Sequence, residues 1–340
     1  MTDRQLHDQL LTIDSHIDIP WPAGPSPFED GPRRVDLPKM LRGGLTAGCF
    51  AAYVPQGKCD EAGFAHAYER AIAMLRAIHE MCEPRHDVPG LAGRLATTVA
   101  EIEAARLEGV PAIIPAVENG HAMGENLARL DEFRRLGARY MTLTHNGHNA
   151  LADSAVPRRD LGDGAERHGG LSALGRAAIA RMNRLGMMVD ISHVSKAAML
   201  QAVALSETPV LATHSSIRAL CDHPRNLDDE QLDALAASGG VVQITLVSFF
   251  LRAGKKESEV TLADYVDHID YAVRRIGVAH VGIGTDFDGG GGVLGFHDAG
   301  ESANLTTELL RRGYDRPAVA ALWGGNFLRL MRLAEEEAVL

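Results

Sequence analysis

The segment LTIDSHID, residues 11–18, starts as an apolar run and ends with a histidine and an aspartate two positions apart. Its apolar and β-branched residues predict a β-strand. Side chains two apart on a strand point to the same face, so His16 and Asp18 project together from its C-terminal end. An imidazole beside a carboxylate forms half of a binding site for a divalent metal. The pair gains weight because other apolar runs end in the same kind of residue.

Eight such runs recur along the chain and predict strands at Thr12–Asp18, Thr46–Val54, Ala112–Glu118, Tyr140–His145, Met187–His193, Val210–His214, Val241–Val247 and Val281–Asp286. Helical periodicity lies between them, at Ala62–Met81, Val99–Glu108, Asn126–Leu136, Ser172–Leu185, Lys196–Leu205, Asp228–Ala237 and Leu262–Ile276. Three of these helices are followed by a glycine that supplies a left-handed stop, at Gly137, Gly186 and Gly277. Alternating strands and helices favour an α/β protein with a parallel sheet.

Eight strand–helix units fit a (β/α)8 TIM barrel, which takes about 250 residues plus insertions. We therefore expect residues 1–340 to form a single barrel domain, with the C-terminal helices packed outside it. The rival fold, a doubly wound sheet, would carry a glycine-rich phosphate loop after the first strand. The residues that follow Asp18 contain no such loop, and the glycine-rich run at 282–292 comes after the eighth strand.

Polar residues mark the C-terminal ends of six predicted strands: His16 and Asp18, Glu118, His145, His193, His214 and Asp286. In a barrel these ends meet at one face, where active sites are built. Four imidazoles and three carboxylates suit zinc or a similar ion, and they exceed what one ion needs. We expect a binuclear centre whose two ions are bridged by one carboxylate. Such a pair of ions activates a shared water for hydrolysis. Asp190 lies an odd number of residues before His193, so we expect it to face the other way and to be structural.

Composition excludes several classes of function. The 340 residues carry a formal charge of −11 and no block of lysine or arginine, which argues against nucleic acid and anionic membrane as partners. The N-terminus lacks the basic and then apolar order of a secretory signal, and no apolar run approaches the ~20 residues of a membrane helix. The four cysteines are scattered and predict reduced thiols. We expect a cytoplasmic protein.

Longer motifs of the chain resemble those of a known protein family. The matching segments are DSHIDIP (14–20), VENG (117–120), MTLTHN (141–146), VDISHVS (189–195), THSS (213–216), RNLDD (225–229), GIGTDFDG (282–289) and GGNFLR (324–329). With these segments in order, the chain resembles the membrane (renal) dipeptidase family of the amidohydrolase superfamily. The resemblance implies a zinc-dependent dipeptidase with two zinc ions per chain, whose shared hydroxide attacks dipeptides that have a free C-terminal carboxylate. It also implies tolerance of a D-residue at that end, and a homodimer.

The resemblance implies a role for each matching residue. His16 and Asp18 would bind the first zinc, His193 and His214 the second, and Glu118 would bridge both. His145 would contact the oxygen of the scissile carbonyl. Arg225 would pair with the substrate carboxylate, a task that suits a planar bidentate cation. Asp286 would carry the proton from the attacking water to the leaving amine.

One departure and two alternatives accompany this interpretation. The segment GVVQITLVSFF, residues 240–250, stands where the family more often has an Asn-Phe-Tyr-like stretch, which opens the question of the preferred side chains. The chain could instead be an amidohydrolase that acts on N-acyl amino acids or lactones. A non-catalytic binding protein on a decayed barrel is the third hypothesis, and the intact set of ligands argues against it.

Overall fold

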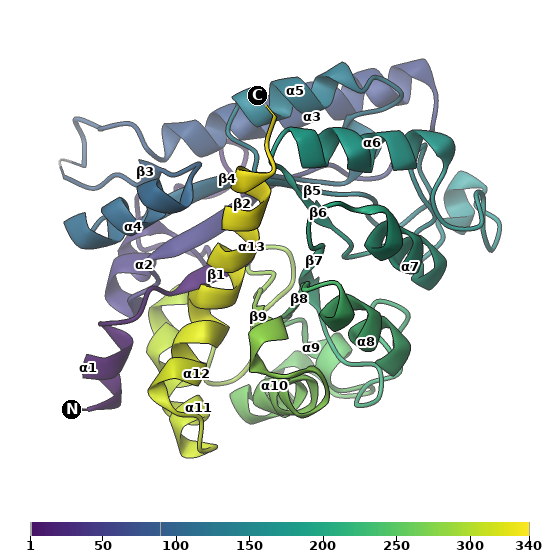
Figure 1. Cartoon of the computed structure of the whole chain (residues 1–340). Coiled ribbons are helices and arrows are strands. Elements are labelled where there is room, and N and C mark those ends of the chain that lie inside the picture. The colour runs from purple at the N-terminus through teal and green to yellow at the C-terminus, as the bar shows by residue number, and fades with distance from the viewer. Residues whose placement is uncertain (1, 89, 340) are drawn as a thin grey trace.

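The computed structural model describes residues 2–88 and 90–339, and its parallel strands curl into a barrel (Figure 1). Eight strands are neighbours in the order β1-β2-β4-β5-β6-β7-β8-β9. The two edges meet where the amide of Asp18 donates to the carbonyl of Phe287 and the amide of Asp286 donates to the carbonyl of His16. These bonds all but close the sheet and confirm the predicted (β/α)8 fold.

Each barrel strand starts within one residue of its predicted start. The strands are β1 (Ile13–Asp18), β2 (Ala47–Tyr53), β4 (Ala112–Glu118), β5 (Tyr140–Thr142), β6 (Met188–Asp190), β7 (Leu211–Ser215), β8 (Val241–Ile244) and β9 (Val281–Ile283). A short extra strand, β3 (Arg94–Leu95), pairs with the first two residues of β4. Strands β5, β6, β8 and β9 end earlier than expected, so the polar residues predicted at the ends of β5, β6 and β9 lie in the turns beyond them.

The helices surround the strands. Those of the predicted repeat are α3 (Glu61–Glu80), α4 (Val99–Glu108), α5 (Ala128–Arg135), α6 (Ala173–Arg184), α7 (Lys196–Leu205), α8 (Asp229–Ala237) and α10 (Leu262–Ile276). The others are α1 (Asp3–His7), α2 (Leu37–Gly43), α9 (Ser248–Leu251), α11 (Ser302–Arg311), α12 (Arg316–Ala320) and α13 (Asn326–Glu336). Reciprocal capping boxes start α4 and α10. The predicted glycine stops are confirmed, since Gly137, Gly186 and Gly277 have φ of 92°, 64° and 84°.

Alternation along the strands sorts side chains between the barrel interior and the helical layer. On β4, Ile114 and Ala116 belong to the inner core, whereas Ile113 and Val117 pack in the outer core under the helices. Glu118 continues the inner series, which places its carboxylate inside the barrel mouth. A β-bulge interrupts β1 between Asp14 and Ile17.

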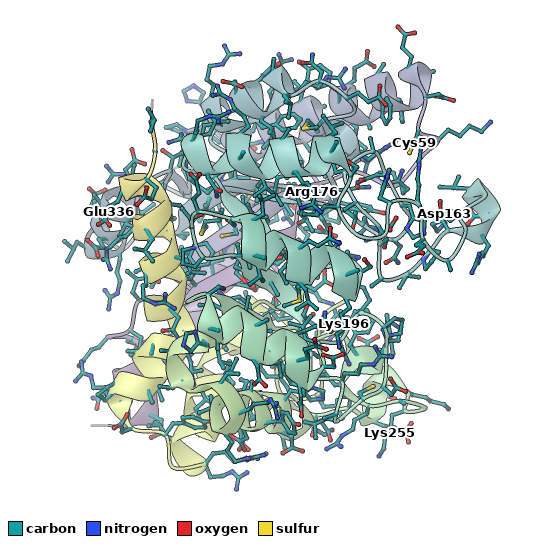
Figure 2. The ribbon with its side chains drawn as sticks, turned by 45° about the vertical axis from the view of Figure 1, so that its right-hand side comes forward. Cys59, Asp163, Arg176, Lys196, Lys255 and Glu336 are labelled. Atoms are coloured by element: carbon teal, nitrogen blue, oxygen red, sulfur yellow. The ribbon has the colours of Figure 1, made fainter. Side chains whose placement is uncertain are left out.

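Helix α13 covers the N-terminal end of the barrel. Its residues Phe327 and Met331 share the inner core with residues at the strand starts, such as Ile13 and Val241. In Figure 1 this helix crosses in front of the strands. In Figure 2, Glu336 of α13 lies at one side of the molecule, and Cys59, Asp163 and Lys255, which follow strands, lie at the other. The long loops after the strands therefore surround the opposite, C-terminal end.

Among residues 2–88 and 90–339, no helix is both long enough and apolar enough to cross a lipid bilayer.

Candidate metal centre

The predicted polar residues converge at the C-terminal end of the barrel. They border a cavity of about 250 Å³ lined by Asp18, Tyr53, Glu118, His145, Asn146, His193, Arg225, Val247, Phe249, Phe250, Asp286, Gly289 and Gly290. His16 and His214 are buried at the base of the same cluster. The structure thus brings together every site residue predicted from the sequence.

Glu118 lies at the centre of the cluster, and its two carboxylate oxygens face different histidines. Oε2 lies 3.6 Å from Nε2 of His16, whereas Oε1 lies 3.2 Å from Nε2 of His193 and 3.5 Å from Nε2 of His214. Nε2 of His145 is 3.9 Å from Oε1. Two groups of possible ligands share this carboxylate: His16 with His214, and His145 with His193. A carboxylate between two sets of imidazoles has the arrangement that a bridging ligand needs.

Hydrogen bonds at Nδ1 define the tautomers of three histidines. The Tyr140 hydroxyl donates its proton to the carbonyl of Ser15, so it accepts from Nδ1 of His16 at 2.9 Å. The Thr213 hydroxyl donates to Asp190 and so accepts from Nδ1 of His214 at 2.8 Å.

The third histidine follows the same rule, because Oδ1 of Asn146 accepts from Nδ1 of His193 at 3.1 Å. Each ring therefore directs the lone pair of Nε2 toward Glu118. This is the pattern of metal-binding histidines, whose other ring nitrogen donates to a fixed oxygen.

The donor set fits divalent metal ions. Nε2 of His16 and Oδ1 of Asp18 are buried, lie 3.8 Å apart and have no hydrogen-bond partner among residues 2–88 and 90–339. Nε2 of His193 and Nε2 of His214 lie 2.9 Å apart, and with both protons on Nδ1 these atoms present lone pairs to each other. A cation held by the two rings would relieve that repulsion. Nitrogen and carboxylate ligands of this kind suit zinc and its first-row neighbours.

Burial determines the charges of these groups. It lowers the pKa of His193 and of His214 well below the usual range, and so keeps both rings in the neutral form that binds metal. Burial, with the Glu118 carboxylate next in weight, raises the pKa of Asp18. Burial also raises the pKa of Asp286. Acidic groups crowded into a buried site are stabilised in the ionised form when cations lie among them.

Asp286 is held close to Asp18 by the turn after β9. Its backbone is left-handed, with φ of 62°. The next turn brings Gly289 so close that a Cβ there would lie 2.4 Å from Oδ1 of Asp286 and 2.5 Å from Oδ2 of Asp18. Any larger residue at position 289 would displace at least one of the two carboxylates, so the turn requires glycine there. Asp286 therefore lines the cavity as a half-buried carboxylate beside Asp18.

Arg225 supplies a cation on the other side of the cavity. Its side chain is buried, Nη2 donates to the carbonyl of His214 at 3.2 Å, and Nε finds no acceptor in the part of the chain that the structure describes. Burial lowers its pKa to about 10, so the guanidinium stays charged at neutral pH. A buried guanidinium with unused donors is suited to pairing with a carboxylate on a ligand.

The sequence interpretation gave no role in this site to three residues that support it: Tyr140, Asn146 and Asp190. The prediction that Asp190 faces away from His193 is wrong. Its carboxylate lies inside the barrel and accepts hydrogen bonds from the hydroxyls of Thr142 and Thr213. Strand β6 ends at Asp190, and His193 follows in a left-handed conformation with φ of 67°, so the alternation of the strand no longer applies.

Comparison with known proteins points to one family. The model of the membrane dipeptidase family (peptidase family M19) matches residues 2–339. Dipeptidase aclJ of Aspergillus oryzae is 35% identical over 312 residues, which cover 90% of this chain and 71% of that protein. Dipeptidase 3 of Mus musculus is 31% identical over 353 residues, which cover 98% and 68%.

Solved structures agree with these matches. A probable dipeptidase, PvdM from Pseudomonas aeruginosa, superposes with a TM-score of 0.92 at 30% identity, over 99% of this chain and 98% of that one. A metallopeptidase from Rhodobacter sphaeroides, solved with a phosphinate mimic of the dipeptide L-Ala-D-Ala, gives a TM-score of 0.81 at 27% identity. That alignment covers 96% of this chain and 99% of that one.

Proposed function

Because this chain belongs to the membrane dipeptidase family, whose members are metal-dependent peptide-bond hydrolases, we propose that it is a dipeptidase with two zinc ions per chain and substrates that carry a free C-terminal carboxylate. One observation carries the proposal: the two oxygens of Glu118 face separate sets of histidines, and the unpaired donors of Arg225 lie across the same small cavity.

The cavity limits the size of the substrate. Sites for larger ligands span about 300–1,000 Å³, and about 250 Å³ is below that range. Arg225 is the cationic side chain among the residues that line it, so the free carboxylate of a short peptide binds there. We place that carboxylate on the guanidinium and the scissile carbonyl beside Glu118. An L- or a D-residue at the C-terminal position meets the same guanidinium.

The two ions, when bound, supply an activated water and a positive charge for the developing oxyanion. His16, Asp18, Glu118, His193 and His214 would hold them. His145 stays neutral, because burial lowers its pKa to about 3, and it donates a hydrogen bond to the carbonyl oxygen of the substrate. Asp286 accepts the proton of the attacking water and passes it to the amine that leaves.

An assay of L–L and L–D dipeptides against the zinc-loaded protein tests the proposal. We expect hydrolysis of dipeptides and no hydrolysis of analogues whose C-terminal carboxylate is amidated. Equal rates on dipeptides and on their amides would contradict the role of Arg225. Two zinc equivalents per chain by elemental analysis would support the binuclear centre, and near-zero zinc with no hydrolysis after zinc is added would contradict the proposal. Sedimentation tests the predicted homodimer.

A further inference from the structure

An apolar wall forms one side of the catalytic cavity, next to Arg225. Strand β8 ends at Ile244, three residues before the predicted end, and the chain turns into the short helix α9. Three residues of this segment line the cavity: Val247, which precedes α9, and Phe249 and Phe250, which lie within it. We call these three residues the apolar wall. It lies in the segment where the sequence departs from the pattern of the family.

The backbone of the wall and of the next residue, Leu251, is held by contacts from two neighbouring segments, the loop between β7 and α8 and helix α10. The side-chain amide of Asn226 donates to the carbonyl of Phe250 at 2.8 Å. The thiol of Cys221 lies 3.4 Å from the carbonyl of Phe249, and Nε2 of His268 lies 3.1 Å from the carbonyl of Leu251. The wall is therefore preorganised, and a ligand that covers it loses little conformational entropy of the protein.

The two phenylalanine rings differ in exposure. Phe250 is buried, with its ring centre 5.5 Å from the guanidinium carbon of Arg225. Phe249 packs edge-on against it at 4.5 Å, but 55% of its surface is exposed. A large apolar side chain on a rigid backbone at the edge of a catalytic cavity offers area for a ligand to cover.

Two glycines line the cavity directly beside the wall, next to Gly291, whose backbone pairs with that of Val247. Gly289 and Gly290 line the cavity there, and a Cβ at Gly290 would lie 4.0 Å from Cγ2 of Val247. A Cβ at Gly290 would touch Val247, so the glycine at this position leaves the side chain of Val247 uncovered. The charged residues that line the cavity (Asp18, Glu118, Asp286 and Arg225) do not belong to the wall, whose own side chains offer neither charge nor hydrogen bonds.

We propose that Phe249 and Val247, supported by Phe250, select dipeptides whose C-terminal residue has an apolar side chain. The inference rests on the proposed function, which places the substrate carboxylate on Arg225. The side chain of the C-terminal residue branches one bond from that carboxylate, so it lies beside the guanidinium and against the wall. Covering a leucine-sized side chain there favours binding about tenfold or more over glycine. A charged side chain that covers the wall loses solvation, and the wall residues themselves offer it no hydrogen-bond or ionic partner.

Phosphinate mimics of Ala–Leu, Ala–Gly and Ala–Asp test the inference without requiring turnover. We expect calorimetry on the zinc-loaded protein to give a dissociation constant for the Ala–Leu mimic about tenfold or more below that for the Ala–Gly mimic, and the weakest binding for the Ala–Asp mimic. The same ranking of kcat/KM is expected for the three dipeptides.

Substitutions at Phe249 assign the preference to the wall. Phe249→Ala should reduce the ratio of Ala–Leu to Ala–Gly affinity severalfold. Phe249→Lys should make the affinity for the Ala–Asp mimic higher than that for the Ala–Leu mimic. Leu107→Ala removes another exposed apolar side chain, on α4, and should leave all ratios unchanged. Thermal unfolding and zinc content of each variant report whether the fold and the metal centre persist.

The outcomes separate the two proposals. Equal affinities for the three mimics would overturn the proposed selectivity of the wall. An unchanged ratio of Ala–Leu to Ala–Gly affinity in a folded Phe249→Ala variant would overturn it as well. A protein that binds the Ala–Leu mimic preferentially through Phe249 and yet hydrolyses none of the dipeptides would support the proposed selectivity of the wall. The same result would overturn the proposed dipeptidase activity.

Discussion

The hydroxyl of Tyr140 lies 2.9 Å from Nδ1 of His16 and donates its only proton to the carbonyl of Ser15. The hydroxyl can therefore only accept from the imidazole, which keeps the ring proton on Nδ1 and leaves Nε2 free beside Glu118. Both residues are fully buried, so water does not replace this contact. A tyrosine from β5 thus orients a proposed metal ligand on β1 across the interior of the barrel.

Tyr140→Phe should weaken zinc binding about 10- to 100-fold, because His16 loses the acceptor that orients it. Competition with a chromogenic chelator measures the affinity directly. Tyr265→Phe is the matched control, since this buried tyrosine also donates to a backbone carbonyl, that of Ile244, but no hydrogen bond joins it to a histidine. Equal losses in the two variants would show that Tyr140 acts only through general stability.

Glu118→Gln should reduce the zinc content and lower kcat about a thousandfold or more, since an amide cannot bridge two cations with two anionic oxygens. Elemental analysis and steady-state kinetics provide the readouts. Glu103→Gln, at a half-exposed position on α4, should behave as the parent. Full zinc occupancy and turnover in Glu118→Gln would contradict the bridging role.

Asp286→Asn should retain both metal ions and lose about 10²- to 10⁴-fold in kcat, the usual contribution of a general base. The amide keeps the shape of the turn beside Gly289 but cannot accept a proton. Zinc analysis and dipeptide kinetics on one preparation separate the two effects. Hydrolysis of Ala–Ala at the parental rate would mean that another group carries the proton.

Arg225→Met should raise KM for dipeptides about 10- to 100-fold, as expected for the loss of a charge-assisted pair with the substrate carboxylate. A neutral ester or lactone substrate should be affected little. Arg218→Met, a change at an exposed arginine seven residues earlier, is the control. A similar loss on charged and neutral substrates would favour the alternative class of amidohydrolase.

The stability of the fold should fall as the pH decreases from about 6.5 toward 4, in part because of His268. Burial lowers the pKa of this histidine to about 4, and its ring joins α10 to the amide of Ile217 and the carbonyl of Leu251. Between these values the unfolded chain binds a proton that the folded protein does not, which favours unfolding.

His268→Gln should therefore flatten the slope of unfolding free energy against pH by about 1.4 kcal/mol per pH unit in this window. Urea unfolding of parent and variant at pH 7, 6 and 5 gives both slopes. Parallel slopes would show that His268 is protonated at the same pH in both states.

The strand starts and the convergence of the polar residues were predictable, because both follow from local periodicity and from the geometry of a parallel barrel. Glu118 could be placed inside the mouth because β4 keeps its alternation to the last residue. The predicted helices agree with the observed ones within two residues at each end, since capping residues and glycine stops mark their limits.

The contacts behind the ligands could not be predicted. Tyr140 begins a strand and resembles any buried aromatic residue, and its partner His16 lies 124 residues earlier. The error at Asp190 has a similar origin, since no local signal announced that β6 stops there and that His193 adopts a left-handed backbone. The apolar wall arises where β8 gives way to α9, although the β-branched run there favours a longer strand.

Four non-glycine residues among those described adopt a left-handed backbone, and all lie at the metal centre or directly beside it: Asn119, His193, Asp286 and Asp288. Each such conformation costs about 1 kcal/mol or more, so the working end of the barrel is its least relaxed part. Heat-tolerant variants are therefore better sought at the N-terminal end of the barrel, beneath α13. Substitutions that relax the backbone at the C-terminal end would displace the side chains of the metal centre.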